Sequence, residues 1–197
     1  MKHIITLAAV IAATPAMAEN FAQHKAHEHG VGELNIAIAG NQLAMELTAP
    51  GADIVGFEYT ATSAEDKQAI EDALAQLQQP LSLINLPVSA ACELLTAESH
   101  LDGDDHKEHA HEDEHAHEEE HAHEDEHAHE EEHQEAEQHT AFHAEYAFNC
   151  ANPAQLKHME FPYFQIFPQA LELEVQIVNH SGARAFEVER AEPQLEF

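Results

Sequence analysis

A stretch of histidine and acidic residues between positions 100 and 143 limits what this chain can fold into. Four hexads of the form His-Ala-His-Glu-Asp/Glu-Glu follow one another from His109 to Glu132, and thirteen of the 19 histidines lie in this stretch. It contains no aliphatic residue larger than alanine between Asp102 and Glu137, so it cannot contribute to a hydrophobic core. A folded domain must therefore come from the segments on either side.

The hexads supply the donor groups that bind transition metals. Imidazole is a common ligand for zinc, copper(II) and nickel(II), and carboxylate can complete a zinc shell. Histidines two apart lie on one side of an extended chain, and histidines four apart share a helix face. We predict that several Zn²⁺ ions bind this tract, although Cu²⁺ and Ni²⁺ also suit its ligands. The predicted ligands are His109, His111, His115, His117, His121, His123, His127, His129 and His133.

Charge indicates how the tract behaves without metal. Each hexad carries three carboxylates and no cation, so we expect residues 100–139 to be a disordered insert. A pH-responsive tract is the alternative, since histidines take up protons near a pKa of about 6.5. The formal charge of the whole chain is −31, which argues against nucleic acid and anionic membrane surfaces as partners.

The first 18 residues are typical of a secretory signal peptide. A short basic opening precedes an apolar run over residues 4–13, and Ala16-Met17-Ala18 is a small-x-small cleavage signature. The run is too short to span a membrane. We therefore expect an exported protein without membrane insertion.

Cys92 and Cys150 are the two cysteines of the chain, and they flank the insert. In an oxidising compartment such a pair predicts one disulfide, with two thiolate metal ligands as the alternative. By the chain-entropy model this bridge would contribute about 3–4 kcal/mol. We expect it to clamp the base of the insert.

Residues 19–99 and 140–197 are predicted to form a single α+β domain with a mostly antiparallel sheet and the insert between two strands. A capping box at Ser63 begins the one clear helix, over about 63–79, and Pro80 ends it. Gly40-Asn41 predicts a hairpin turn. Apolar alternation predicts strands at 34–38, 43–47, 142–150, 171–178 and 185–189, and residues 91–98 are interpreted as the strand that pairs with 142–150.

Less regular segments lie between these elements. Residues 57–60 are interpreted as a short strand or an irregular extension, and residues 81–86 are too few to assign. Asn152 is predicted to cap a helical turn over 152–156, and residues 161–167 to form a packing segment without regular structure.

A disulfide between directly opposed cysteines would fix the register of the two strands that flank the insert. In that register Leu94 faces Phe148, Thr96 faces Tyr146 and Ser99 faces His143.

The domain itself offers a second set of candidate ligands. His27 and His29 share the polar side of the first strand with Glu33, and His143 lies on the polar side of a later strand. If the strands approach each other, these three histidines could form one metal site; otherwise they are frayed or merely exposed. The chain has no HExxH motif, phosphate loop or nucleophile elbow, so we predict that it is not an enzyme.

Four blocks of the sequence resemble the ZrgA-type family of zinc-regulated periplasmic proteins. They are His27-Glu-His-Gly-Val-Gly-Glu-Leu-Asn-Ile-Ala37, Pro50-Gly-Ala-Asp-Ile-Val-Gly-Phe-Glu58, Phe142-His-Ala-Glu-Tyr-Ala-Phe-Asn-Cys-Ala-Asn-Pro153 and Leu171-Glu-Leu-Glu-Val-Gln-Ile177. The resemblance implies a Gram-negative periplasmic zinc-binding protein that works beside an inner-membrane zinc importer. It supports the blocks at His27 and His143 as motifs, without fixing which residues are ligands.

These observations favour a protein that captures zinc and supports its uptake. In this hypothesis the insert is a capture arm and the folded domain holds a further site. The alternative is a buffer or resistance protein that sequesters excess zinc, copper or nickel.

Overall fold

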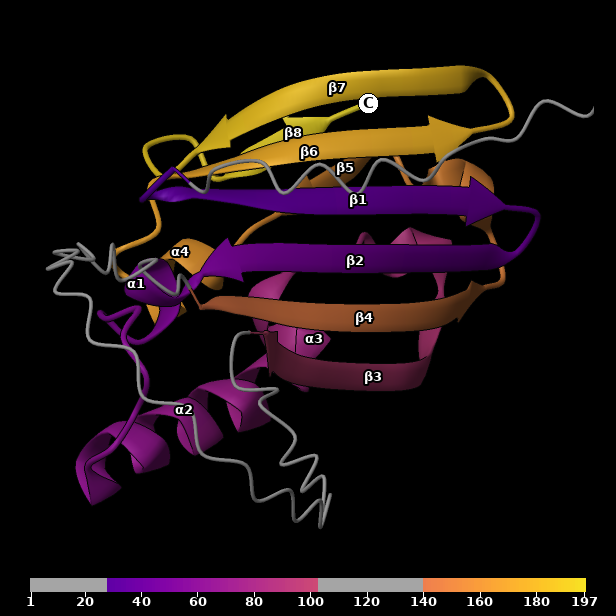
Figure 1. Cartoon of the computed structure of the whole chain (residues 1–197). Helices are drawn as coiled ribbons and strands as arrows, with labels where there is room; N and C mark the ends of the chain where they lie inside the picture. Colours follow the sequence, from indigo (N-terminus) through magenta and orange to yellow (C-terminus); the bar gives the residue numbers. More distant parts are fainter. Residues whose placement is uncertain (1–27, 103–139) are drawn as a thin grey trace, which may run out of the picture.

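A six-stranded sheet organises the residues that this computed structural model describes, 28–102 and 140–197 (Figure 1). The strand order is β3-β4-β2-β1-β6-β7, with β1 and β6 parallel and the other neighbours antiparallel. The strands are β1 (Val31–Ala39), β2 (Gln42–Pro50), β3 (Cys92–Asp102), β4 (Ala141–Cys150), β6 (Glu172–Asn179) and β7 (Gly182–Glu189). The predicted α+β class with a mostly antiparallel sheet is confirmed, whereas the parallel β1–β6 pair is not predicted by the sequence.

One face of the sheet is covered and the other is open. Alternate side chains of the central strands, such as Leu34, Met45, Phe148 and Val175, are buried, while those between them face solvent. The cover consists of helix α2 (Ala64–Leu77), the short helices α3 (Pro80–Leu83) and α4 (Tyr163–Ile166), and a two-stranded sheet of β5 (His158–Glu160) and β8 (Gln194–Glu196). Short turns at α1 (Gly51–Ile54), η1 (Val88–Ala90) and η2 (Pro153–Gln155) connect these elements.

Helix α2 begins where the capping box predicts. The Ser63 side chain accepts a hydrogen bond of 3.0 Å from the Asp66 backbone N–H. At the other end of the helix, the Tyr146 hydroxyl on β4 donates to the Leu77 carbonyl at 2.9 Å. This bond satisfies a carbonyl that the helix leaves unpaired and joins the helix to the sheet.

The register of β3 against β4 differs from the predicted one beyond the first positions. Cys92 faces Cys150 and Leu94 faces Phe148 as predicted, but an irregularity between Leu94 and Thr96 shifts the pairing by one residue. The predicted pairs of Thr96 with Tyr146 and of Ser99 with His143 are therefore wrong. The extra residue of a β-bulge has no marked sequence signal, because Leu95 continues the apolar run.

The corrected register brings two histidines together. Strand β3 continues past the predicted end at residue 98, to Asp102, and it places His100 opposite His143. A one-residue shift exchanges the two faces of a strand. The bulge is thus what puts His100 on the same face as His143.

The remaining differences concern short segments. Residues 57–60 contain no strand, in agreement with the second interpretation, an irregular extension, and the unassigned segment after Pro80 forms α3. The turn at 152–156 is a 3-10 helix whose Asn152 side chain makes no capping hydrogen bond, and the segment at 161–167 contains the four-residue helix α4. The predicted signal peptide, His27 and the repeat histidines lie outside the described residues. None of the described helices is long and apolar enough to cross a membrane.

The disulfide between Cys92 and Cys150 is present, but it does not clamp the base of the insert. It joins the first residue of β3 to the last residue of β4, whereas the insert leaves from Asp102 and returns to Ala141 at the other end of the same ladder. At about 3.3 Å per residue the two ends are roughly 30 Å apart. The predicted clamp is wrong, because the insert connects the strand ends that lie opposite the bridge.

Replacing both cysteines should therefore destabilise the domain without changing metal binding. In the double variant C92S/C150S we expect the free energy of unfolding to fall by about 4 kcal/mol, since the bridge spans 58 residues of sequence. Urea denaturation of the metal-free protein measures this change. Reductant should have no effect on the variant, and a loss of zinc affinity in the folded variant would contradict the expected separation.

Candidate metal centre

The open face of the sheet carries a group of three metal-ligating side chains at the end where the insert attaches. They are His100 and Asp102 on β3 and His143 on β4. His100 and His143 are direct cross-strand partners, and Asp102 lies two residues beyond His100 on the same side of β3. One ligand atom from each residue lies within 4.8 Å of the others. It is the only such group among residues 28–102 and 140–197.

The Asp102 carboxylate bridges the two imidazoles. Its Oδ2 lies 3.1 Å from Nε2 of His143, and its Oδ1 lies 3.4 Å from Nε2 of His100. The two rings stack with centroids 5.0 Å apart and planes 13° apart. Both Nε2 atoms therefore point toward the same carboxylate, which is the arrangement that a shared cation needs.

The two nitrogen–oxygen distances are close to those between ligands of a tetrahedral zinc ion. Ligand atoms about 2.1 Å from zinc at tetrahedral angles lie about 3.4 Å from one another. Two imidazoles and one carboxylate are also a ligand set that zinc accepts while keeping a fourth position open. The side chains of His100 and Asp102 are 57% and 62% exposed, so an ion can reach them from solvent.

His143 is the anchored member of the group, since its side chain is only 21% exposed. Its Nδ1 lies 3.2 Å from the hydroxyl of Thr48. Thr48, on β2, is the cross-strand partner of His143. If Nδ1–H donates to that hydroxyl, the lone pair of Nε2 points toward Asp102. A hydrogen bond of this kind fixes the tautomer and the ring orientation of a metal-binding histidine.

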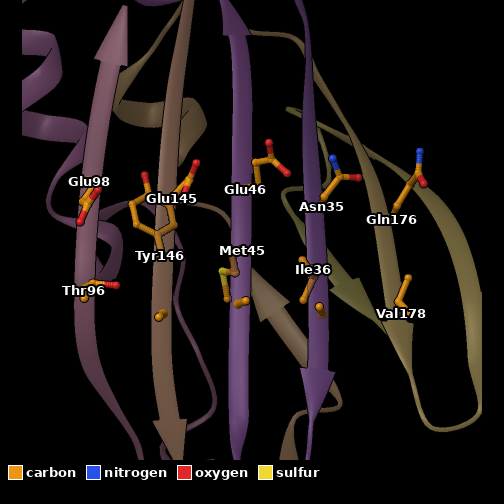
Figure 2. A pocket seen from close by; sticks show the side chains of 13 residues that line it. Asn35, Ile36, Met45, Glu46, Thr96, Glu98, Glu145, Tyr146, Gln176 and Val178 are labelled. Atoms are coloured by element: carbon orange, nitrogen blue, oxygen red, sulfur yellow. The ribbon is translucent and has the colours of Figure 1, made fainter. Parts of the chain in front are cut away.

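Carboxylates continue across the open face beside this group. Glu98 and Glu145 lie two residues from His100 and His143 along their strands and face each other. Together with Glu46 on β2, the partner of Glu145, they form one row of side chains across the sheet (Figure 2). Asn35 on β1 extends the row. The row lines a shallow pocket of about 630 Å³ whose remaining floor includes alanines of the same strands. The three glutamates of the pocket attract cations, and none of the residues that line it is basic.

A second set of acids lies on β1, β6 and β7. Glu33, Glu174 and Glu187 are paired across β1, β6 and β7. Glu172, beside them, has a pKa raised by partial burial and then by its neighbours Glu187 and Glu189. Crowded carboxylates of this kind gain from a nearby cation.

The structure does not join His29 to the His143 group. Nε2 of His29 lies 3.0 Å from Oε2 of Glu58, and no group of three ligand atoms within 4.8 Å in the described parts of the chain includes both His29 and His143. His29 also precedes β1 instead of belonging to it. His27, the third member of the hypothesised three-histidine site, lies outside the described residues.

His100 and Asp102 are not predicted by the sequence as partners of His143. As the first histidine of the acidic stretch, His100 falls within the predicted insert. A signal is nevertheless present in the alternation of Glu98, His100 and Asp102, which extends the polar side of the predicted strand by four residues.

Fold and site together define a sheet domain with a candidate divalent-metal centre where its insert attaches. The comparison with known families agrees with this class. The model of the family described as "ZrgA family zinc uptake protein" matches residues 26–197, so the chain belongs to the ZrgA family. Comparison with curated proteins gives no match.

Replacing Thr48 by valine should weaken metal binding while leaving the fold intact. Valine keeps the shape of threonine but removes the hydroxyl that orients His143, and such outer-shell changes typically cost about 10- to 100-fold in metal affinity. The measurement is zinc competition against a chromophoric chelator. It uses a short-linker chain, in which a Gly/Ser linker replaces residues 103–139 and joins strand ends that are already neighbours.

Thr96→Val is the matched control. Thr96 is exposed on the same face of the sheet, but it lies two residues beyond Glu98 on β3, on the side away from His100. Equal affinities of the two variants would show that Thr48 does not orient the ligand.

Proposed function

We propose that this protein binds zinc outside the inner membrane, in the periplasm, and supports its uptake, with His100, Asp102 and His143 as the specific site of the folded domain. The observation that carries the proposal is the convergence of both Nε2 atoms on the Asp102 carboxylate. Membership in a family of zinc uptake proteins supports zinc as the cargo.

The insert is proposed to be a capture arm. Asp102, a member of the site, is the last residue of β3 before the insert, and Thr140 and Ala141 receive the chain on its return. An ion held by the repeat histidines, from His109 to His133, therefore has a short route along the chain to the domain site. Ordering a flexible segment costs conformational entropy, so the arm should release ions more readily than the preformed site.

The exposed, three-ligand character of the site favours transfer over storage. Structural zinc sites are closed by four protein ligands, whereas a site with an open position can accept a further ligand from a partner. We propose an inner-membrane zinc importer or its periplasmic component as that partner, and binding instead of catalysis as the role of the site.

Zinc titration by calorimetry tests the division between site and arm. The short-linker chain should keep tight zinc binding and lose the weaker equivalents of the full chain, because its ligands are held by β3 and β4. Adding H100A/H143A should remove one tight equivalent, while His158→Ala, at an exposed position on β5, should not. If the short-linker chain retains no tight zinc, the domain is only a scaffold for the insert.

Growth of the host bacterium separates uptake from sequestration. Cells that lack the protein should grow poorly under zinc chelation, and wild-type protein, but not H100A/H143A, should restore growth. A sequestering protein would instead leave growth under chelation unchanged and protect cells against excess zinc, copper or nickel.

A further inference from the structure

The open face of the sheet carries a row of small side chains, mostly apolar, beside the glutamates of the pocket. The row takes one residue from each strand, and each residue is the cross-strand partner of the next. Ala37 and Ala44 at its centre are exposed, and Val178 on β6 is 52% exposed. The members of this alanine row are, from β3 to β7, Thr96, Ala147, Ala44, Ala37, Val178 and Ala183. A largely apolar strip therefore crosses the whole sheet.

Longer side chains border the alanine row on both sides. On the other side from the metal group, Gln42 and Asn149 face each other on β2 and β4. On the side of the metal group, two residues along the strands, lie Glu98, Glu145, Glu46, Asn35 and Gln176 (Figure 2). The alanine row is therefore the floor of the pocket of about 630 Å³, and the three glutamates form an acidic wall along it.

The dimensions of this surface fit a segment of polypeptide. Six strands spaced about 4.8 Å apart give a floor about 24 Å long, and the floor and the wall are about 7 Å apart. The length corresponds to about 16 residues of helix or about seven of extended chain. A segment that lies along the floor needs apolar side chains against the alanines and polar or charged ones against the glutamates.

Charge decides what kind of segment fits. Among the residues of the six strands, Arg184 is the only lysine or arginine, and it pairs with the buried Ile177 and so lies on the covered side. Glu33, Glu174 and Glu187 continue the negative charge of the open face beyond the wall. Complementary charge therefore calls for lysine or arginine on the docked segment.

The same charge excludes other occupants. A second copy of this face would set glutamates against glutamates, and like charges in such positions are destabilising. Each hexad of the insert contains three carboxylates, so the metal-free insert is repelled in the same way. Nucleic acid and anionic lipid also carry negative charge. The surface fits a basic segment of another protein.

We propose that the alanine row and its acidic wall form a docking surface for a basic, amphipathic segment of a partner protein. The inference rests on the proposed function and deepens it, because it names the chemistry of the partner that receives zinc. Glu98 and Glu145 in the wall are two residues from His100 and His143 along their strands. A segment docked along the wall lies beside the exposed zinc site.

Cross-linking in the host bacterium tests the docking surface. The full chain carries a photoreactive amino acid in place of Gln42, which is exposed at the border of the alanine row. We expect a cross-link to a partner segment that contains lysine or arginine beside apolar residues. Glu46→Gln with Glu145→Gln should lower the cross-linking yield about 3- to 10-fold, because two exposed ion pairs are lost. Ala37→Gln with Ala44→Gln, which fills the floor, should abolish the cross-link.

Two controls separate docking from overall charge and from zinc binding. Glu65→Gln with Glu71→Gln removes the same charge from exposed positions on α2, on the covered side of the sheet, and should leave the yield unchanged. The variant with the filled floor changes exposed positions only, so its fold should be intact. Its zinc affinity should equal that of the wild type, because Ala44 pairs with Ala147, which is about 13 Å along β4 from His143. Calorimetry measures that affinity.

Each outcome decides the proposal. A cross-link to a basic segment that the wall and floor variants both weaken supports it. A cross-link to residues 19–27 of the same chain, which include Lys25, or to a second copy overturns it. So does a partner segment without lysine or arginine, a cross-link that either variant leaves unchanged, or the absence of any cross-link. Loss of tight zinc binding with an intact cross-link overturns the zinc site instead and leaves the docking surface.

Discussion

The pairing of β3 with β4 is the constraint on which the rest of the structure depends. It sets His100 opposite His143, makes Asp102 and Ala141 neighbours, and so allows a long polar insert to leave and re-enter the domain at one place. The hydrogen-bonded ladder and the disulfide bridge at its end hold β3 and β4 together. The fold therefore does not depend on packing by the insert. The bridge and the metal group occupy opposite ends of the ladder, which separates stability from binding.

The open face of the sheet explains why this fold is suited to cations. Its covered face buries the apolar side chains, so the alternate positions are free to carry polar groups. Glu46, Glu145 and Glu98 stand directly opposite one another across three strands, although like charges in such positions are destabilising. The domain tolerates the repulsion between these glutamates on the surface beside His100, Asp102 and His143. A cation bound nearby would reduce that repulsion.

Sequence patterns predict the frame of the domain well, because period-two alternation, the capping box at Ser63 and the hairpin turn are local signals. The register beyond Leu94 could not be predicted, since it depends on which residue of an apolar run forms the bulge. The parallel pair of β1 and β6 could not be predicted either, because it joins segments that are far apart in the chain. The candidate site divides in the same way. His143 and His29 are predicted as ligands, but the partners of His143 depend on the shifted register, and Glu58 lies in a segment without regular structure. Ligand identity follows from composition and alternation, whereas ligand grouping depends on tertiary contacts.

The exposure of the three ligands matters for moving an ion. His100 and Asp102 are more than half exposed, so an ion there can be reached by a competing ligand without any change in the domain. His143 is only 21% exposed and contacts the Thr48 hydroxyl, so this ligand keeps its position while the others exchange. Because Asp102 ends β3 and β4 begins two residues before His143, the group lies where the insert leaves and re-enters the domain. An ion passed from the insert therefore meets one fixed ligand and two accessible ones, which favours quick capture and release over storage.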